Sequence, residues 1–244
     1  MIKKIIFDLD NTLINWEDTY FTYAVENTCK DLNITYSNKI LELVINSINN
    51  YESLYNKFTT ENLTKVFNNM AQENSINFKF TENFTKKILF YFSCCIPKQI
   101  DSNILNILDY LHKKYELVIL TNWFEKEQAI RLKNSGLLPY FTNVYGTEKI
   151  KIKPNTEAFQ TAIGTCKPEE CIMIGDNFSS DILGALNSNI NAIFLNKKSV
   201  DFNELIHKNN LEKFLNSNIT NTISKNNSPF VLCIQSLTEL LNIL

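Results

Sequence analysis

Short apolar runs alternate with longer amphipathic stretches along the second half of this 244-residue sequence. After Pro97 the runs predict strands at 117–121, 143–145, 171–175 and 191–195, and the intervening stretches predict helices at about 101–114, 125–135, 155–165 and 180–188. Strands separated by helices of this length pair in parallel through right-handed crossovers. The alternation therefore predicts an α/β protein with a parallel sheet, which a strand at 230–235 and a helix at 237–244 complete.

The first strand leads directly into two carboxylates. Lys4-Ile5-Ile6-Phe7 is a short apolar run, and the segment 8–13, Asp-Leu-Asp-Asn-Thr-Leu, follows it. Doubly wound sheets carry their chemistry where strands end, so Asp8 and Asp10 are candidate catalytic residues. The alternative is an Asx-turn in which the side chains of Asp10 and Asn11 only satisfy loop amides.

A helical insertion separates this strand from the rest of the sheet. Residues 16–96 contain four amphipathic stretches: Trp16 to Leu32, a second from the N-cap Ser37 to Phe58, a third from Thr60 and a fourth from Thr81. Most of their periodic Leu, Ile and Phe residues are expected to form the core of a helical bundle. Such a bundle would have no direct part in catalysis.

The composition excludes several classes of partner. With 24 basic and 26 acidic residues the net charge is −2, so no basic surface for a nucleic-acid polymer or an anionic membrane is expected. There is no apolar run near the length of a membrane span, and we expect no secretory signal, because the first strand leads directly into the candidate catalytic residues. The 6 cysteines fit neither a secreted disulfide framework nor a zinc site. We expect a cytoplasmic protein.

Three later segments repeat the pattern of a strand ending in polar residues. Thr121-Asn122 follows the run at 117–120, and Gly175-Asp176 ends the run at 171–174, with Asp181 five residues beyond. Between them, Lys153-Pro154 stands at the start of a predicted helix. In this order, the four segments resemble the motifs of the haloacid dehalogenase (HAD) superfamily of hydrolases over residues 1 to about 196.

That resemblance implies a domain organisation. The core would comprise 1–15 and 97–244 as a Rossmann-like parallel sheet, and 16–96 would form an inserted four-helix cap of the C1 type. The sequence most resembles nucleotidase-like and phosphoglycolate-phosphatase-like members. The polar stretch 196–228, with a helix-like run from Phe202 to Leu215, is longer than the family pattern has there. We interpret it as a surface excursion or an oligomer contact, with a substrate-specificity element as the alternative.

The resemblance also implies a phosphatase mechanism. Asp8 would be the nucleophile that forms an aspartyl-phosphate, and Asp10 the acid and base that serves both halves of the reaction. Mg²⁺ would be held by the Asp8 carboxylate, the Asp10 backbone carbonyl and Asp176. Asp181 is expected outside that ligand set, where it would accept from a water ligand or from Lys153, or cap the next helix. Dehalogenases lack an acid at the position of Asp10, which favours a phosphate ester as the substrate.

The remaining candidates would hold the phosphoryl group. Lys153 would supply a positive charge to Asp8 and the phosphate; Lys151 is the nearby alternative, without the proline that follows the motif lysine. The hydroxyl of Thr121 would donate to a phosphate oxygen, or else only cap the helix that follows. Backbone amides would complete the pocket, those of Leu9, Asp10 and Asn122.

Substrate choice is expected to depend on the cap. Trp16, Tyr20 and Trp123 flank the motifs, where their rings would stack on a nucleobase or else only pack the cap onto the core. We predict a Mg²⁺-dependent phosphatase for a small phosphorylated metabolite, with nucleoside monophosphates as the first candidate, acting as a monomer or homodimer. A sugar-phosphate mutase, which also needs both aspartates, and a non-catalytic HAD-fold binding protein are the alternatives. The motifs do not identify the substrate itself.

Overall fold

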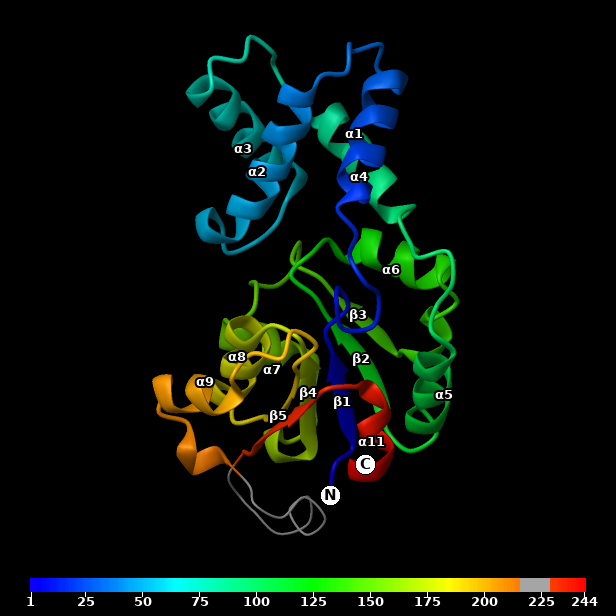
Figure 1. Ribbon diagram of the computed structural model, residues 1–244, viewed down its shortest axis with the longest axis vertical. Helices are drawn as coiled ribbons and strands as arrows, with labels where there is room; N and C mark the ends of the chain where they lie inside the picture. Colours follow the sequence, from blue (N-terminus) through cyan, green and yellow to red (C-terminus); the bar gives the residue numbers. More distant parts are fainter. Residues whose placement is uncertain (216–228) are drawn as a thin grey trace.

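A six-stranded parallel sheet forms the core of the protein (Figure 1). The computed structural model describes residues 1–215 and 229–244. In those residues the strand order is β3-β2-β1-β4-β5-β6, and every neighbouring pair is parallel. The strands are β1 (Lys4–Phe7), β2 (Glu116–Leu120), β3 (Asn143–Tyr145), β4 (Cys171–Gly175), β5 (Asn191–Leu195) and β6 (Val231–Ile234).

Helices cover both faces of the sheet, which explains why its strands are continuous apolar runs. In β1, Ile5 and Phe7 belong to one buried cluster and Ile6 to another on the opposite face. The first face is covered by α5 (Ser102–Leu111), α6 (Glu125–Asn134) and α11 (Leu240–Ile243). The second is covered by α7 (Thr156–Ile163), α8 (Leu183–Asn187) and α9 (Phe202–Lys208). Figure 1 shows these two layers on either side of the strands.

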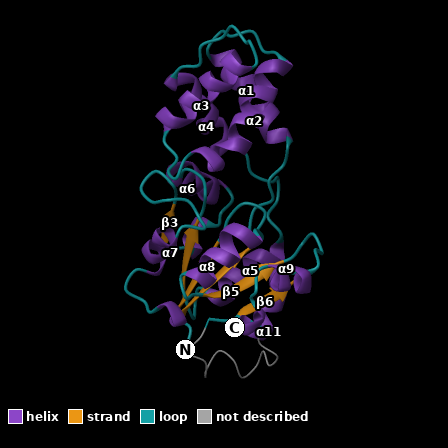
Figure 2. Cartoon of the chain, turned by 90° about the vertical axis from the view of Figure 1, so that its left-hand side faces the viewer, coloured by secondary structure: helices purple, strands orange, loops and turns teal. Residues whose placement is uncertain are grey.

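Four helices form a separate group beyond one end of the sheet (Figures 1 and 2). They are α1 (Thr19–Asp31), α2 (Asn38–Leu54), α3 (Thr60–Glu73) and α4 (Glu82–Ser93). Polar side chains start three of them: Ser37, Thr59 and Thr81 each accept a backbone N–H from the first turn. Their apolar faces share one buried cluster, separate from the two clusters of the sheet. No helix in residues 1–215 and 229–244 is long and apolar enough to cross a membrane.

The predicted fold class is confirmed, with corrections at some helices. The predicted helix at 180–188 begins instead with a π-helical turn, Phe178–Ile182, before α8. The run from Phe202 to Leu215 is not one helix, because the chain turns at Asn209 and Asn210, where Asn210 has a positive φ of 55°. The second predicted helix ends at Leu54 rather than Phe58. Most of the excursion at 196–228 cannot be compared, because 216–228 lie outside the described residues.

The strand order places a topological switch point beside β1. From β1 the chain continues through β2 and β3 on one side, and β4, β5 and β6 lie on the other. Ligands of open α/β sheets bind beyond the carboxyl ends of the strands at such a point. In this protein the four-helix group stands at that same end (Figure 1).

Candidate active site

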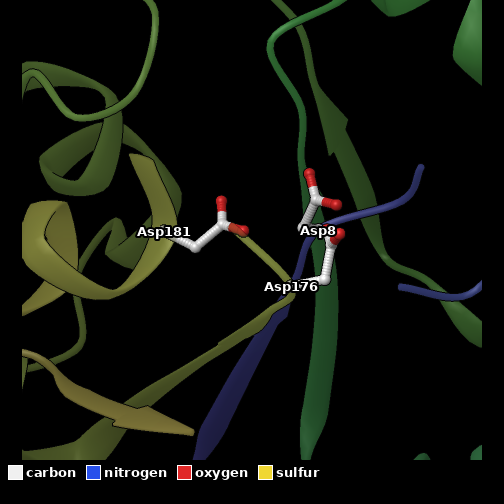
Figure 3. Close-up of side chains that lie close together, drawn as sticks. All are labelled: Asp8, Asp176 and Asp181. Atoms are coloured by element: carbon white, nitrogen blue, oxygen red, sulfur yellow. The ribbon is translucent and has the colours of Figure 1, made fainter. Parts of the chain in front are cut away.

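The carboxyl ends of β1 and β4 bring three carboxylates together. Asp8 directly follows β1, Asp176 directly follows β4, and Asp181 lies one turn further on (Figure 3). One oxygen atom from each of the three lies within 4.8 Å of the others. The Asp8 amide donates to the carbonyl of Ile174 at 2.9 Å, which continues the pairing of β1 with β4 past the end of the strand. Sheet register therefore fixes how Asp8 and Asp176 face each other.

A tight turn follows Asp8 and contains the second aspartate, Asp10. The amides of Leu13 and Ile14 both donate to the Leu9 carbonyl, at 2.9 and 3.0 Å. Asn11 has a φ of 60°, in the left-handed region that Asn tolerates better than most residues. The Thr12 hydroxyl donates to Asp8 Oδ2 at 3.1 Å and lies 3.4 Å from Asp176 Oδ1. The turn thus holds the Asp8 carboxylate while it directs the chain toward α1.

Lys153 lies at the centre of the site. Its side chain is 2% exposed, and Nζ donates to Asp8 Oδ1 at 2.7 Å and to Asp181 Oδ1 at 2.6 Å. The Asn122 side chain holds the backbone on both sides: Oδ1 accepts the Lys153 amide at 2.7 Å and Nδ2 donates to the Lys153 carbonyl at 3.0 Å. Lys151, the alternative from the sequence, instead pairs with Glu157 at the surface. The lysine in the site is therefore Lys153.

Asp181 is held by donors from its own loop as well as by Lys153. Its Oδ2 accepts the Asn177 amide at 3.0 Å, and Asn177 Oδ1 in turn accepts the amides of Ser179 and Ser180, both at 3.0 Å. Gly175 leaves room for this carboxylate, because a Cβ at that position would collide with it. The π-helical turn of 178–182 therefore directs Asp181 back toward Lys153.

Burial changes the acidity of these groups. Burial raises the pKa of Asp8 to about 7, against the opposing attraction of Lys153, and raises that of Asp176 to about 6 with a further contribution from Asp8. Burial also raises the pKa of Asp181. For Lys153, burial disfavours the ammonium ion, yet the Asp181 and Asp8 carboxylates raise its pKa above the ordinary value. One lysine thus faces three carboxylates that are costly to ionise together.

The donor set fits a hard divalent cation. Lys153 pairs with two of the three carboxylates, and the charge of Lys197 also acts on Asp176. With all three carboxylates ionised, negative charge would still be in excess, and Mg²⁺ would neutralise it with the oxygen ligands it prefers. Both oxygens of Asp181 already accept hydrogen bonds, whereas only the long Thr12 contact at 3.4 Å reaches Asp176 within the described residues. Asp176 is therefore the least committed of the three carboxylates, because both oxygens of Asp8 also accept hydrogen bonds, from Lys153 and Thr12.

The Thr121 hydroxyl accepts a hydrogen bond from the protein and can donate one to a ligand. Thr121 directly follows β2, is 3% exposed, and its Oγ1 accepts a hydrogen bond from Gln128 Nε2 at 3.1 Å. With a lone pair engaged, its own O–H proton is free for a ligand oxygen. Leu9 is fully buried, backbone as well as side chain. The Asn122 side chain is already committed to Lys153.

A cavity of about 690 Å³ opens over these groups and reaches the four-helix group. Trp16 and Trp123 line it, together with side chains that the sequence did not single out: Asp18, Phe21, Ile45, Ile48, Asn49 and Lys198. Tyr20 does not line it; its ring packs edge-on against Trp16 at 5.4 Å. The indole Nε1 of Trp123 is buried without a hydrogen-bond partner among the described residues. The four-helix group thus contributes three apolar side chains, Phe21, Ile45 and Ile48, and one polar side chain, Asn49.

Several of these residues were missed because their positions depend on packing between distant elements. Ile45, Ile48 and Asn49 belong to α2, where the periodic pattern predicts only a helical core. Gln128 and Arg131 belong to α6, and both are fully buried. Arg131 carries the one available signal, because it is the only arginine in the sequence.

Comparison with known proteins establishes the class. Residues 5–195 match the haloacid dehalogenase-like hydrolase family, and since this is most of the chain, the chain belongs to that family. Pyrimidine 5'-nucleotidase PynA of Streptococcus pneumoniae is 28% identical over 211 residues, which cover 80% of this chain and 84% of PynA. Glyceraldehyde 3-phosphate phosphatase of Methanothermobacter thermautotrophicus is 31% identical over 110 residues, which cover 43% of this chain and 49% of the relative.

A solved structure shares the whole fold. The putative HAD-hydrolase YfnB of Bacillus subtilis, bound to magnesium, matches with a TM-score of 0.66 and 20% identity, covering 99% of this chain and 98% of YfnB. The description of that structure reports interdomain movement. With the family match and relatives named as phosphatases, the predicted enzyme class, a phosphatase of the HAD superfamily, is confirmed.

Proposed function

We propose that this enzyme hydrolyses nucleoside monophosphates through an aspartyl-phosphate on Asp8, with Mg²⁺ as its cofactor. The observation that carries the proposal is the position of Asp8 beside Lys153, at 2.7 Å, on the floor of a cavity large enough for a small metabolite. The nucleotidase name of PynA, a relative over most of this chain, supports the choice of substrate.

In the first half of the reaction, an Asp8 oxygen attacks phosphorus and the bond from phosphorus to the ester oxygen breaks. Asp10 gives its proton to that leaving oxygen. Lys153, the Thr121 hydroxyl and the backbone amides of Leu9, Asp10 and Asn122 stabilise the charge on the phosphoryl oxygens. Asp181 holds Lys153 in place for this purpose, since Nζ donates to its carboxylate at 2.6 Å.

In the second half, Asp10, now ionised, takes a proton from water, which attacks the aspartyl-phosphate. Inorganic phosphate leaves and Asp8 is regenerated. Mg²⁺, when bound to the Asp8 and Asp176 carboxylates and the Asp10 carbonyl, would neutralise the repulsion between the phosphate and Asp8. The site carries more carboxylates than ammonium groups in the described residues, which supports a requirement for such a cation.

The four-helix group would act as a cap that selects the leaving group. We propose that residues 16–96 form this cap and that 1–15 with 97–244 form the catalytic core. Phe21, Ile48 and the two tryptophans offer flat or apolar contact area to a base. The Asn49 amide offers hydrogen bonds to the polar groups at its edge. The interdomain movement described for YfnB supports a cap that moves.

The proposed setting follows from the same residues. All 6 cysteines lie in the described part of the chain and are unpaired, which supports action in the cytoplasm, where thiols stay reduced. The partner is a small phosphorylated metabolite, and we propose that the enzyme works as a monomer or homodimer.

A phosphate-release screen tests the proposal. Nucleoside monophosphates, sugar phosphates and phosphoglycolate would each be assayed with Mg²⁺ and with a chelator. We expect a nucleoside monophosphate to have the highest kcat/KM, and no release in chelator. A preference for sugar phosphates would refute the substrate, and a requirement for a bisphosphate activator would favour the mutase instead.

A tryptophan variant tests whether the cavity wall contacts the base. If a nucleobase stacks on Trp123, Trp123→Ala should cost about 1–3 kcal/mol in kcat/KM for the nucleotide and much less for a simple aryl phosphate. Trp16→Ala and Tyr20→Ala are compared in the same assay; the Tyr20 ring lies outside the cavity lining and should affect both esters equally. Equal losses on both esters for all three variants would mean that these rings only pack the cap.

A further inference from the structure

The only arginine of the chain is buried next to Asp10. Arg131 lies on α6, is fully buried, and its Nη1 forms an ion pair with Asp10 Oδ1. Nη1 also donates to Gln128 Oε1 at 2.9 Å, and Nε donates to the Cys95 carbonyl at 3.0 Å. The guanidinium carbon lies 5.3 Å from the centre of the Trp16 ring. One cation therefore contacts the acid–base candidate and two distant parts of the chain.

Gln128 completes the set of contacts around Asp10. It lies one turn before Arg131 on the same helix and is also fully buried. Its Nε2 donates to Asp10 Oδ2 at 2.5 Å and to the Thr121 hydroxyl at 3.1 Å. Because Arg131 engages the amide oxygen, the amide nitrogen has to face Asp10 and Thr121. Each Asp10 oxygen thus has its own donor on α6.

These contacts meet where the helical group joins the sheet. Trp16 belongs to the first linker, residues 11–18, and Cys95 to the second linker, residues 94–101. Arg131 contacts both linkers through different atoms, and its Nη2 is buried without a partner among the described residues. The buried hydroxyl of Tyr20, beside the first linker, likewise has none there. Arg131 Nη2 and the Tyr20 hydroxyl are therefore donors that could form hydrogen bonds if the linkers shifted.

We propose that Arg131 and Gln128 are positioning residues that orient the Asp10 carboxylate toward the leaving oxygen. Because Arg131 contacts both linkers, the orientation of Asp10 would depend on the position of the linkers. The inference rests on the proposed function, in which Asp10 is the acid and base. A buried arginine is costly unless its partners are well placed, and simple packing of α6 would not require a guanidinium. Displacement of a catalytic group by about 1 Å can cost roughly 10²-fold in rate.

The test compares two esters that differ in their need for an acid. A nucleoside monophosphate leaves as an alkoxide and needs a proton, whereas 2,4-dinitrophenyl phosphate leaves as a stable phenolate. The value of kcat/KM covers the steps up to the first irreversible one, so hydrolysis of the aspartyl-phosphate does not obscure it. The variants are Arg131→Lys, Gln128→Met and Asp10→Asn, with Lys133→Met as the control, because Lys133 is an exposed cation on the same helix.

We expect Arg131→Lys and Gln128→Met each to lower kcat/KM for the nucleotide by roughly tenfold or more, and for the dinitrophenyl ester by less than about threefold. The control should match the parent. In the Asp10→Asn background, Arg131→Lys should have almost no further effect, because it acts through the missing acid. Circular dichroism identifies any variant that fails to fold, in which case the other one decides.

Other results overturn the inference. Equal losses on both esters, losses that persist in the Asp10→Asn background, or no loss at all would give Arg131 and Gln128 a merely structural part. The proposed function fails separately: if Asp10→Asn itself affects both esters equally, Asp10 is not the acid. If Asp10→Asn separates the esters but the α6 variants do not, the positioning inference alone is wrong.

Discussion

Replacing Lys153 with methionine removes the cation from a buried cluster of carboxylates. Its Nζ pairs with Asp8 at 2.7 Å and with Asp181 at 2.6 Å. At an effective dielectric constant of about 20, each pair has a gross attraction of about 6 kcal/mol, most of which offsets the desolvation of the ions. Removing one partner of a buried ion pair typically costs about 3–5 kcal/mol, since the other charge is left uncompensated. We expect a loss in that range for Lys153→Met at alkaline pH, and no turnover.

The loss should depend on pH in a definite direction. In the parent, the Asp8 pKa is raised from 3.8 to about 7. The stability that comes from protonated Asp8 in the folded protein is therefore lost as the pH rises from about 3.8 to about 7. Without Lys153 the pKa of Asp8 must be higher still, because a cation that favoured the carboxylate is gone. Above about pH 7 the variant then holds a proton that the parent does not. Its disadvantage should grow by up to about 1.4 kcal/mol per pH unit, until that proton is released.

Urea unfolding followed by circular dichroism, in chelator at pH 7 and 8.5, measures both effects. Lys151→Met is the matched control: it removes a lysine two residues away whose partner is Glu157 at the surface, where a pair contributes about 1 kcal/mol or less. The reasoning is refuted if Lys153→Met costs no more than the control. It is also refuted if the loss is the same at both pH values.

Other changes at the site have expected outcomes as well. Asp8→Asn should abolish phosphate release, because an amide is not a nucleophile here, whereas Asp10→Asn should lower turnover by roughly 10²-fold or more; steady-state rates close to the parent would contradict either role. Gly175→Ala places a Cβ against the Asp181 carboxylate, so we expect about 1–3 kcal/mol of destabilisation in thermal unfolding, and an unchanged melting temperature would contradict that contact. Mg²⁺ affinity, measured by calorimetry, should fall as pH is lowered through about 7 and then about 6, since protons compete for Asp8 and Asp176; an affinity independent of pH would exclude these ligands.

The sheet could be predicted from the sequence because its signals are local. The inner strands are buried on both faces, so β4 and β5 appear as uninterrupted apolar runs and match the predictions at 171–175 and 191–195; the edge strand β3, predicted at 143–145, is only partly buried. The motif residues directly follow such runs, and a parallel sheet gathers the ends of its strands at one edge. Asp8, Thr121 and Asp176 are therefore placed together by register alone.

Loop geometry was less predictable. Asp181 reaches Lys153 only because residues 178–182 form a π-helical turn and because position 175 has no Cβ. A one-residue change in helical phase has no signature in apolar periodicity. The sequence therefore left three hypotheses for Asp181: contact with a water ligand, contact with Lys153, or a helix cap. In the structure its Oδ1 contacts Lys153 and its Oδ2 accepts the amide of Asn177.

The contacts around Asp10 could not be predicted because they join three segments that are distant in the sequence: residues 10–16, Cys95 and α6. Gln128 and Arg131 are three residues apart on α6, a spacing that also suits a solvated polar stripe, and the low apolar content of this helix favours that interpretation. In the fold the Cys95 carbonyl and the Trp16 ring lie against the Arg131 guanidinium, and Gln128 contacts Asp10 and Thr121. A polar residue that tertiary structure buries has the same local sequence pattern as one in water. The only clue in the sequence was that Arg131 is the one arginine of a lysine-rich chain. Lysine lacks the planar guanidinium that can bond a carboxylate and a carbonyl at once.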